Sequence, residues 1–132
     1  MVTLVAKIVS GGQTGADRGG LDAAIALGIP HGGWCPKGRR AEDGKVPARY
    51  ELEETGSANY QNRTRRNVLD SDGTVVFTPG APAGGSRLTI QIAREVGKPF
   101  LHLDTRALGS RSQDAVRRLR AWLLENGTKT LN

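Results

Sequence analysis

The chain has little of three things on which many small proteins depend: cysteine, aromatic residues and long hydrophobic runs. Its single cysteine, Cys35, excludes an internal disulfide and suits the reducing cytoplasm. No segment approaches the ~20 consecutive apolar residues that cross a bilayer, and the N-terminus lacks the basic and apolar pattern of a signal peptide. These absences predict a cytoplasmic protein that does not enter a membrane.

Aromatic residues make up only 5% of the chain, and basic residues outnumber acidic ones, which leaves a net charge of +6. A basic balance favours anionic partners such as phosphates, nucleotides and oxyanions. The basic residues are spread over many segments without interleaved aromatics, which argues against a base-stacking surface for nucleic acid. We therefore expect a small phosphorylated ligand or oxyanion as the partner, and no nucleic acid.

Strand-like and helix-like segments alternate along the 132 residues. Apolar and β-branched runs predict strands at 4–10, 29–34, 74–78 and 100–104, and a last strand after 128. Apolar spacing predicts helices at 16–27, 59–70, 86–96 and 112–125, the last with Val116, Leu119 and Leu123 inward and Trp122 on its flank. This alternation predicts a Rossmann-like, doubly wound α/β fold with a mostly parallel sheet and helices on both faces. Because no linker or repeat interrupts it, residues 1–132 are expected to form a single ligand-binding domain.

Residues 35–57 are the longest stretch without a clear hydrophobic period, and they are interpreted as a polar loop that is functional or mobile. Cys35, His31 and His102 do not have the spacing of metal ligands, and Cys35 is interpreted as a structural thiol. No Ser-His-Asp arrangement has a recognisable context. The sequence therefore predicts neither a metal site nor a catalytic residue.

The first glycine-rich motif, residues 10–17 (SGGQTGAD), leaves a strand and opens a helix. Glycines let a backbone approach an anion, and a helix N-terminus offers free N–H groups. The motif is neither a G-x-G-x-x-G fingerprint nor a P-loop, and a tight turn with a capping Asp17 is the alternative interpretation. Its predicted ligand-binding residues are Gly11, Gly12, Gln13, Thr14, Gly15 and Asp17.

The second motif, residues 79–89 (PGAPAGGSRLT), also leads from a strand into a helix. Ser86 fits an N-cap, which is the simpler interpretation. Arg87 in the first turn opposes the helix dipole, and a bound anion would remove that conflict. In a doubly wound sheet such loops meet at the switch point where ligands bind. The predicted ligand-binding residues of this motif are Gly84, Gly85, Ser86, Arg87 and Thr89.

A polar set on the middle helix lies at helical spacing and comprises Tyr60, Arg63, Thr64 and Asn67. It is either a solvated surface or a hydrogen-bonding face of the ligand crevice. An arginine fork matches phosphate, which makes Arg63 its strongest member. With Lys37 and Arg39 of the long loop, this set is predicted to read the ring of the ligand, while the glycine loops bind its phosphate.

These residues together resemble the molybdenum carrier family, the molybdenum cofactor carrier proteins. The likeness rests on residues 8–19 (IVSGGQTGADRG), 33–39 (GWCPKGR), the polar set on the middle helix, 71–74 (SDGT) and the Gly84-Gly85 loop, and it spans about residues 6–104. The family belongs to a Rossmann-like group that includes lysine-decarboxylase-like phosphoribohydrolases and DNA-processing protein A. In the family, a short Gly-Pro-Arg segment follows the final Leu-Asn. This sequence ends at Leu131-Asn132, so the resemblance does not cover that segment.

The resemblance implies a carrier that binds the molybdenum cofactor (molybdopterin), a pterin with a phosphate, and that forms homo-oligomers. It implies no catalysis. The related hydrolases carry a glutamate in P-G-G-x-G-T-x-x-E, whereas residues 84–92 (GGSRLTIQI) have none and place Gln91 in the helix. The alternatives left open are a phosphoribohydrolase-like enzyme acting on nucleoside monophosphates and a nucleotide-sensing module.

Overall fold

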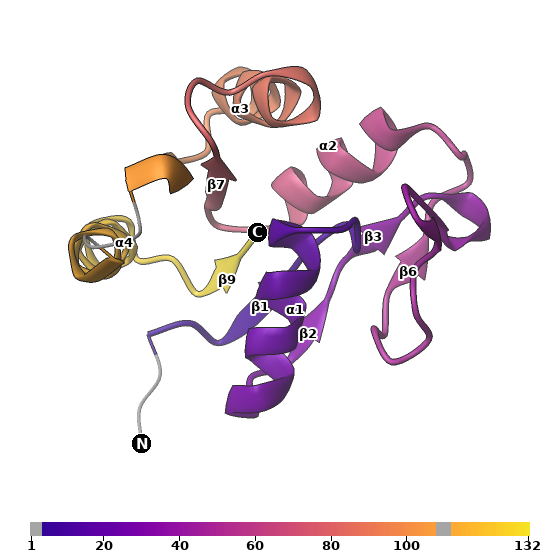
Figure 1. Ribbon diagram of the computed structural model, residues 1–132, viewed down its shortest axis with the longest axis horizontal. Helices are drawn as coiled ribbons and strands as arrows, with labels where there is room; N and C mark the ends of the chain where they lie inside the picture. Colours follow the sequence, from indigo (N-terminus) through magenta and orange to yellow (C-terminus); the bar gives the residue numbers. More distant parts are fainter. Residues whose placement is uncertain (1–3, 108–111) are drawn as a thin grey trace.

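Short apolar segments form two parallel ladders that meet in one sheet in the computed structural model, which describes residues 4–107 and 112–132 (Figure 1). β1 (Lys7–Val9) pairs with β2 (His31–Gly32) on one side and with β9 (Thr130–Leu131) on the other. β7 (Thr74–Thr78) pairs with β8 (Phe100–Asp104), and both strands have the bounds that the sequence predicts. The ladders join because Val75 N donates to Asn132 O and Asn132 N donates to Gly73 O, each over 2.9 Å. The last strand therefore lies in the middle of the sheet, between β1 and β7.

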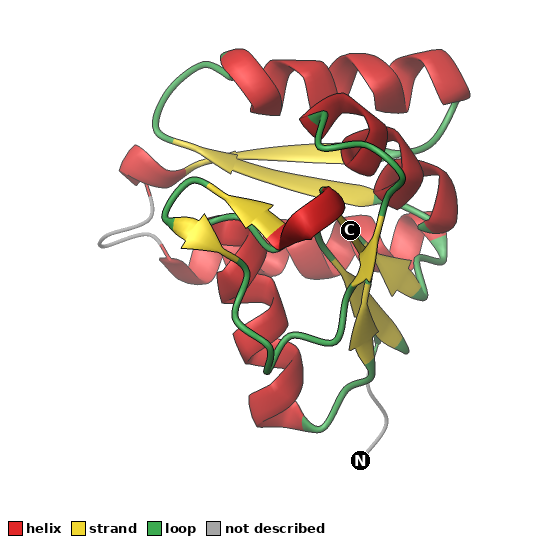
Figure 2. Ribbon diagram, turned by 90° about the vertical axis from the view of Figure 1, so that its right-hand side faces the viewer, coloured by secondary structure: helices red, strands yellow, loops and turns green. Residues whose placement is uncertain are grey.

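Four long helices cover this sheet. They are α1 (Ala16–Leu27), α2 (Tyr60–Asp70), α3 (Gly84–Val96) and α4 (Ser112–Asn126). α2 and α3 lie on one face, and α1 and α4 lie on the other (Figures 1 and 2). This arrangement confirms the predicted Rossmann-like α/β fold. The predicted start of α3 is wrong by two residues, because the helix begins at Gly84 with Ala83 as its N-cap and Ser86 lies inside its first turn.

The segment expected to be a long loop is instead built from short elements. They are β3 (Trp34–Cys35), the 3-10 turn η1 (Lys37–Arg39), the hairpin of β4 (Arg40–Ala41) and β5 (Gly44–Lys45), and β6 (Glu53–Glu54), which pairs with β3. Cys35, Val46 and Tyr50 are buried with Leu21 of α1 in one hydrophobic cluster. The prediction of a loop fails because this packing is long-range and has no local period. A second 3-10 turn, η2 (Thr105–Ala107), follows β8.

Gly33 separates β2 from β3 and allows a close approach of two strands. Its φ is +123°, and a Cβ at this position would overlap the backbone of Ser10. Only glycine fits such a position without moving backbone. The close contact with Gly33 therefore fixes the position of the end of β1, where the first glycine motif begins.

The C-terminal helix packs through Leu119 and Leu123, as its predicted register has it, but not through Val116. Leu123 is buried beside Leu131, and Leu119 and Trp122 pack in the same cluster, Trp122 against Gly73. Val116 is 64% exposed, so its predicted inward position is wrong. Among the residues that the structure describes, none of the helices is long and apolar enough to cross a membrane.

Candidate functional site

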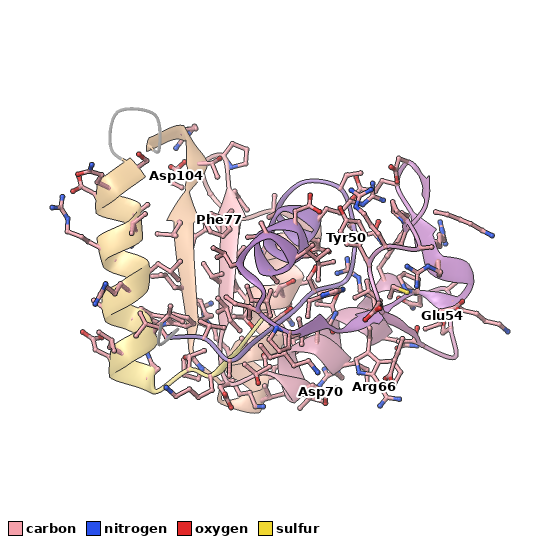
Figure 3. All side chains as sticks on the ribbon, turned by 90° about the horizontal axis from the view of Figure 1, so that it is seen from below. Tyr50, Glu54, Arg66, Asp70, Phe77 and Asp104 are labelled. Carbon is pink, nitrogen blue, oxygen red and sulfur yellow. The ribbon has the colours of Figure 1, made fainter. Side chains whose placement is uncertain are left out.

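A cavity of about 840 Å³ opens where the loop after β1 meets the first turn of α3 and the side of α2. This is the carboxyl edge of the sheet near its switch point, where doubly wound folds bind ligands. Figure 3 shows Phe77 on β7 between α4 and α1, on the sheet face that forms the apolar floor of the cavity. The polar residues predicted from the sequence that line it are Gln13, Thr14, Asp17, Arg63, Thr64, Asn67, Ser86 and Thr89, with Gly85 among them.

Hydrogen bonds within the first glycine motif hold its shape. Ser10 Oγ donates to Asp17 O over 2.9 Å and accepts from Gly12 N over 3.2 Å. Gln13 N donates to Asp17 Oδ2 over 3.1 Å, so the loop closes on the first turn of α1. Gly11, Gly12 and Gly15 form the support of this loop rather than the wall of the cavity. Gly12 has a φ of +75°, which favours glycine there.

Side chains of this motif also position an acidic group that the sequence did not single out as a ligand-binding residue. Gln13 Nε2 donates to Arg40 O over 2.9 Å, and Glu42 N donates to Gln13 Oε1 over 3.1 Å. Thr14 Oγ1 donates to Glu42 Oε2 over 3.4 Å. The hairpin of β4 and β5 is thereby tied to the loop after β1, and Glu42 lines the cavity. No local pattern signals this contact, because it joins segments 29 residues apart.

Arg63 of α2 enters the cavity wall beside the glycine loop. Its side chain is 18% exposed, and its Nη1 lies 3.4 Å from Asp17 Oδ2. A Cβ at position 11 would overlap this guanidinium, so Gly11 makes the room for it. Its buried Nε has no hydrogen-bond partner among the described residues, and the guanidinium lies 5.7 Å from the ring centre of Tyr60. Arg63 is therefore a partly buried cation with one donor unused.

Neighbouring groups shift the pKa of Asp17 in opposite directions. Burial raises the pKa of Asp17 above its ordinary value, and the nearby Glu42 carboxylate adds to the rise. Arg63, the Gln13 N–H and Arg18 act in the lowering direction without cancelling it. Arg18 contributes little because its guanidinium binds Asp43 at 2.6 Å. Asp17 is thus a carboxyl whose charge is only partly compensated.

The second glycine loop is fixed from β8. Asp104 Oδ1 accepts from Gly80 N over 2.9 Å, and Thr78 Oγ1 donates to Gly80 O over 2.8 Å. Arg106, with the Gly80 N–H, lowers the pKa of Asp104, so this carboxylate keeps its charge. These hydrogen bonds therefore fix the position of the loop and of the start of α3 beside the cavity.

Several predicted site residues use their polar groups within the protein. Asn67 is 2% exposed, accepts from Trp34 N over 2.8 Å and donates to Trp34 O over 3.0 Å. The Arg39 guanidinium donates to four carbonyl oxygens, those of Val46, Pro47, Tyr50 and Leu52. Thr64 and Thr89 each donate to a carbonyl of the preceding helical turn. These side chains position the elements around the cavity.

Other predicted residues lie away from the cavity wall. Arg87 lines a separate groove of about 460 Å³ on the outer side of α3, together with Arg94 and Glu95. Lys37 is exposed on η1 and does not line the cavity, and neither does Gly84. Tyr60 does not line the cavity; its ring lies beside the guanidinium groups of Arg63 and Arg40. Within residues 4–107 and 112–132, no three His, Cys, Asp or Glu side chains are grouped to hold a metal ion.

Comparison with known proteins places this geometry in a family. Residues 8–132 match the model of the circularly permutated YpsA SLOG family (cpYpsA). A crystal structure named "Putative molybdenum carrier protein", from Syntrophus aciditrophicus SB, is 46% identical and superimposes with a TM-score of 0.92, over 98% of this chain and 80% of that chain. Among curated proteins, none is significantly similar in sequence. The resemblance to the molybdenum carrier proteins is thereby confirmed. The match of the family model over nearly the whole chain leads to one conclusion: the chain belongs to the circularly permutated YpsA SLOG family.

Proposed function

We propose that this protein is a carrier that binds the phosphate of the molybdenum cofactor in the cavity at the carboxyl edge of the sheet. The observation that carries the proposal is Arg63, a partly buried guanidinium at the cavity wall whose buried Nε has no partner among the described residues. Buried donors are normally satisfied, so an unused one beside a cavity favours a ligand with acceptor oxygens. The printed name of the relative from Syntrophus, a molybdenum carrier, supports this choice of ligand.

The site offers further groups for a phosphate. Gly85 and Ser86 line the cavity in the first turn of α3. Ser86 N donates to Ala83 O over 3.2 Å, whereas the N–H of Gly85 has no acceptor within the helix. This N–H and the Ser86 hydroxyl suit an oxyanion, and the guanidinium of Arg63 suits its charge. A volume of about 840 Å³ lies in the range of cavities that hold a phosphorylated heterocycle.

The ring of the ligand then lies next to the phosphate, beside the loop after β1. Thr14 and Glu42 provide a hydroxyl and a carboxylate there, which suit the donors and acceptors of a pterin. Asn67 and Arg39 no longer belong to the proposed ring-reading set, because their polar groups are engaged within the protein.

Binding without hydrolysis is the role we propose. At the position of the glutamate in the related hydrolases stands Gln91, which is exposed, donates to Glu95 over 3.2 Å and lines the outer groove of α3. It therefore cannot supply a carboxylate to a ligand in the main cavity.

A calorimetric titration with AMP as a phosphorylated probe and adenosine as its phosphate-free counterpart tests the proposal. Arg63→Ala should weaken AMP binding by roughly ten- to a hundredfold, because a charged donor contributes about 1.5–3 kcal/mol. Arg65→Ala is the matched control, since Arg65 lies on the same helix, is 50% exposed and pairs only with Glu95 in the described structure. Equal losses for both variants, or equal affinity of the wild type for AMP and adenosine, would contradict the proposal.

We further propose that the carrier is a cytoplasmic homo-oligomer. Leu27 of α1 is 70% exposed and Val116 of α4 is 64% exposed, so both helices present a large apolar side chain to solvent. A second copy of the chain would cover these side chains. Light scattering should give a mass well above 14.1 kDa at micromolar concentration, and a mass near 14.1 kDa would count against self-association.

A further inference from the structure

Arg63 and Asp17 form an ion pair with a long contact distance, although both side chains are largely shielded from solvent. Their closest atoms, Nη1 and Oδ2, are 3.4 Å apart, although the Arg63 side chain is only 18% exposed and that of Asp17 is 31% exposed. The geometry is longer than the 2.7–2.9 Å of strong charged hydrogen bonds, which are roughly twice as strong as neutral ones. A second anion that binds the guanidinium at a shorter distance would therefore stabilise Arg63 more than its contact with Asp17 does.

Arg63 has a donor that the protein itself does not use. Its Nε is buried without a partner among the described residues, so an anion meets it only when the guanidinium moves, and Gly11 leaves the guanidinium free of contact with a side chain at that position. An oxyanion that accepts from the guanidinium would draw it toward itself and away from Asp17. The Asp17 carboxylate would then face an anion across the same small cavity.

No other cation in the described structure is placed to take over from Arg63 at Asp17. From α2 the carboxyl faces Arg63, from the β4–β5 hairpin it faces the like charge of Glu42, and from α1 it faces Arg18. Arg18 is held by Asp43, with Nη1 and Nη2 donating over 2.6 and 2.7 Å, and its Nε donates to Gly12 O. Two carboxylates and an oxyanion would therefore share one freely available guanidinium.

We propose that oxyanion binding at Arg63 is coupled to the uptake of one proton by Asp17. The proton comes from solvent and joins a carboxylate oxygen of Asp17, and the neutral acid donates its O–H to the bound oxyanion. Arg63 exchanges Asp17 for the oxyanion, and no other bond changes. The inference rests on the proposed function, since the oxyanion is the phosphate of the carried ligand. Protonation of Asp17 thereby removes one negative charge from the site, which suits a bound dianion.

The raised pKa of Asp17 has the direction that this step needs, because burial already disfavours the charged form of the carboxyl. Linkage gives the sign of the pH dependence. A site that takes up a proton on binding loses affinity as pH rises, by up to about tenfold per pH unit when one whole proton is taken up. Asp17→Asn removes the proton-binding group and keeps the shape of the side chain.

The experiment is calorimetric titration of the wild-type protein with sulfate, a tetrahedral dianion whose own charge is constant across the neutral range. Titrations in two buffers of different ionisation heat count the protons taken up. We expect about one proton for the wild type at neutral pH and none for Asp17→Asn. We also expect the affinity of Asp17→Asn to be independent of pH. Asp43→Asn is the matched control, because Asp43 binds Arg18 and not Arg63, and it should keep the wild-type pH dependence.

Sulfate binding to the wild type without proton uptake would overturn the inference and leave the proposed function standing. The inference also fails, again without harm to the proposed function, if Asp17→Asn shows the pH dependence of the wild type. If the wild type binds neither sulfate nor AMP at any pH, both the proposed function and the inference fail.

Discussion

Asn67→Ala separates a structural role of Asn67 from a role in reading the ligand. The side chain joins α2 to β3 through two hydrogen bonds with Trp34, of 2.8 and 3.0 Å, and it is 2% exposed. Its removal leaves the Trp34 N–H and C=O without these partners in a buried region. At about 1–3 kcal/mol for each unsatisfied group, we expect a loss of about 3 kcal/mol. That is a large part of the ~5–15 kcal/mol by which a domain is stable.

Asn59→Ala is the matched control on the same helix. Asn59 caps α2 by accepting from Gln61 N over 2.8 Å at an exposed position, so its loss should cost about 1 kcal/mol. Urea unfolding followed by circular dichroism gives both values, and titration with AMP and adenosine gives the ligand preference of each folded variant. The structural role of Asn67 is refuted if Asn67→Ala costs no more than Asn59→Ala, or if it changes the preference between the two ligands.

Three further substitutions test other parts of the structure. Gly33→Ala should destabilise by about 3 kcal/mol in thermal unfolding, since its Cβ would overlap the backbone of Ser10 at a φ of +123°; a neutral effect would contradict the strand contact. Gly11→Ala should keep the fold but displace the Arg63 guanidinium and weaken sulfate binding about tenfold, and unchanged binding would argue against Arg63 as the anion site. The backbone N–H groups of Thr130 and Lys129 lower the pKa of Asp72, so its stabilisation is present above the ordinary carboxyl pKa of about 3.9 and is lost as pH falls from there through the lowered pKa of the folded state. Asp72→Asn should accordingly cost roughly 1 kcal/mol at neutral pH and little in acid, which unfolding at both pH values would check.

Local patterns predicted those elements whose signal is contained in their own residues. β7 and β8 have the predicted bounds, and α1 and α3 end at Gly28 and Gly97, which both adopt the left-handed conformation that favours glycine there. The two glycine loops meet at one sheet edge because both follow parallel strands of the same sheet. The position of the cavity is therefore predictable from the alternation of strands and helices.

Long-range contacts decided what the sequence did not predict. The segment at 35–57 is ordered by the Arg39 guanidinium, which binds four carbonyls, and by the burial of Tyr50, neither of which has a local period. Asn67 has the composition of a ligand-reading residue, but its amide is matched to the backbone of Trp34. The position of Arg87 in the first turn predicts that it contacts the anion, whereas its side chain lies on the outer groove of α3. Sequence spacing places a residue on a helix but does not decide which neighbour it meets.

The central claim, that the cavity carries a phosphorylated ligand held by Arg63, is tested most directly by native mass spectrometry of the protein purified from its own host. We expect a species heavier than the 14.1 kDa chain by the mass of a phosphorylated pterin, and its loss in Arg63→Ala but not in Arg65→Ala. A wild-type protein that carries no such ligand, even after incubation with the molybdenum cofactor, would contradict the claim, as would a ligand retained equally by Arg63→Ala.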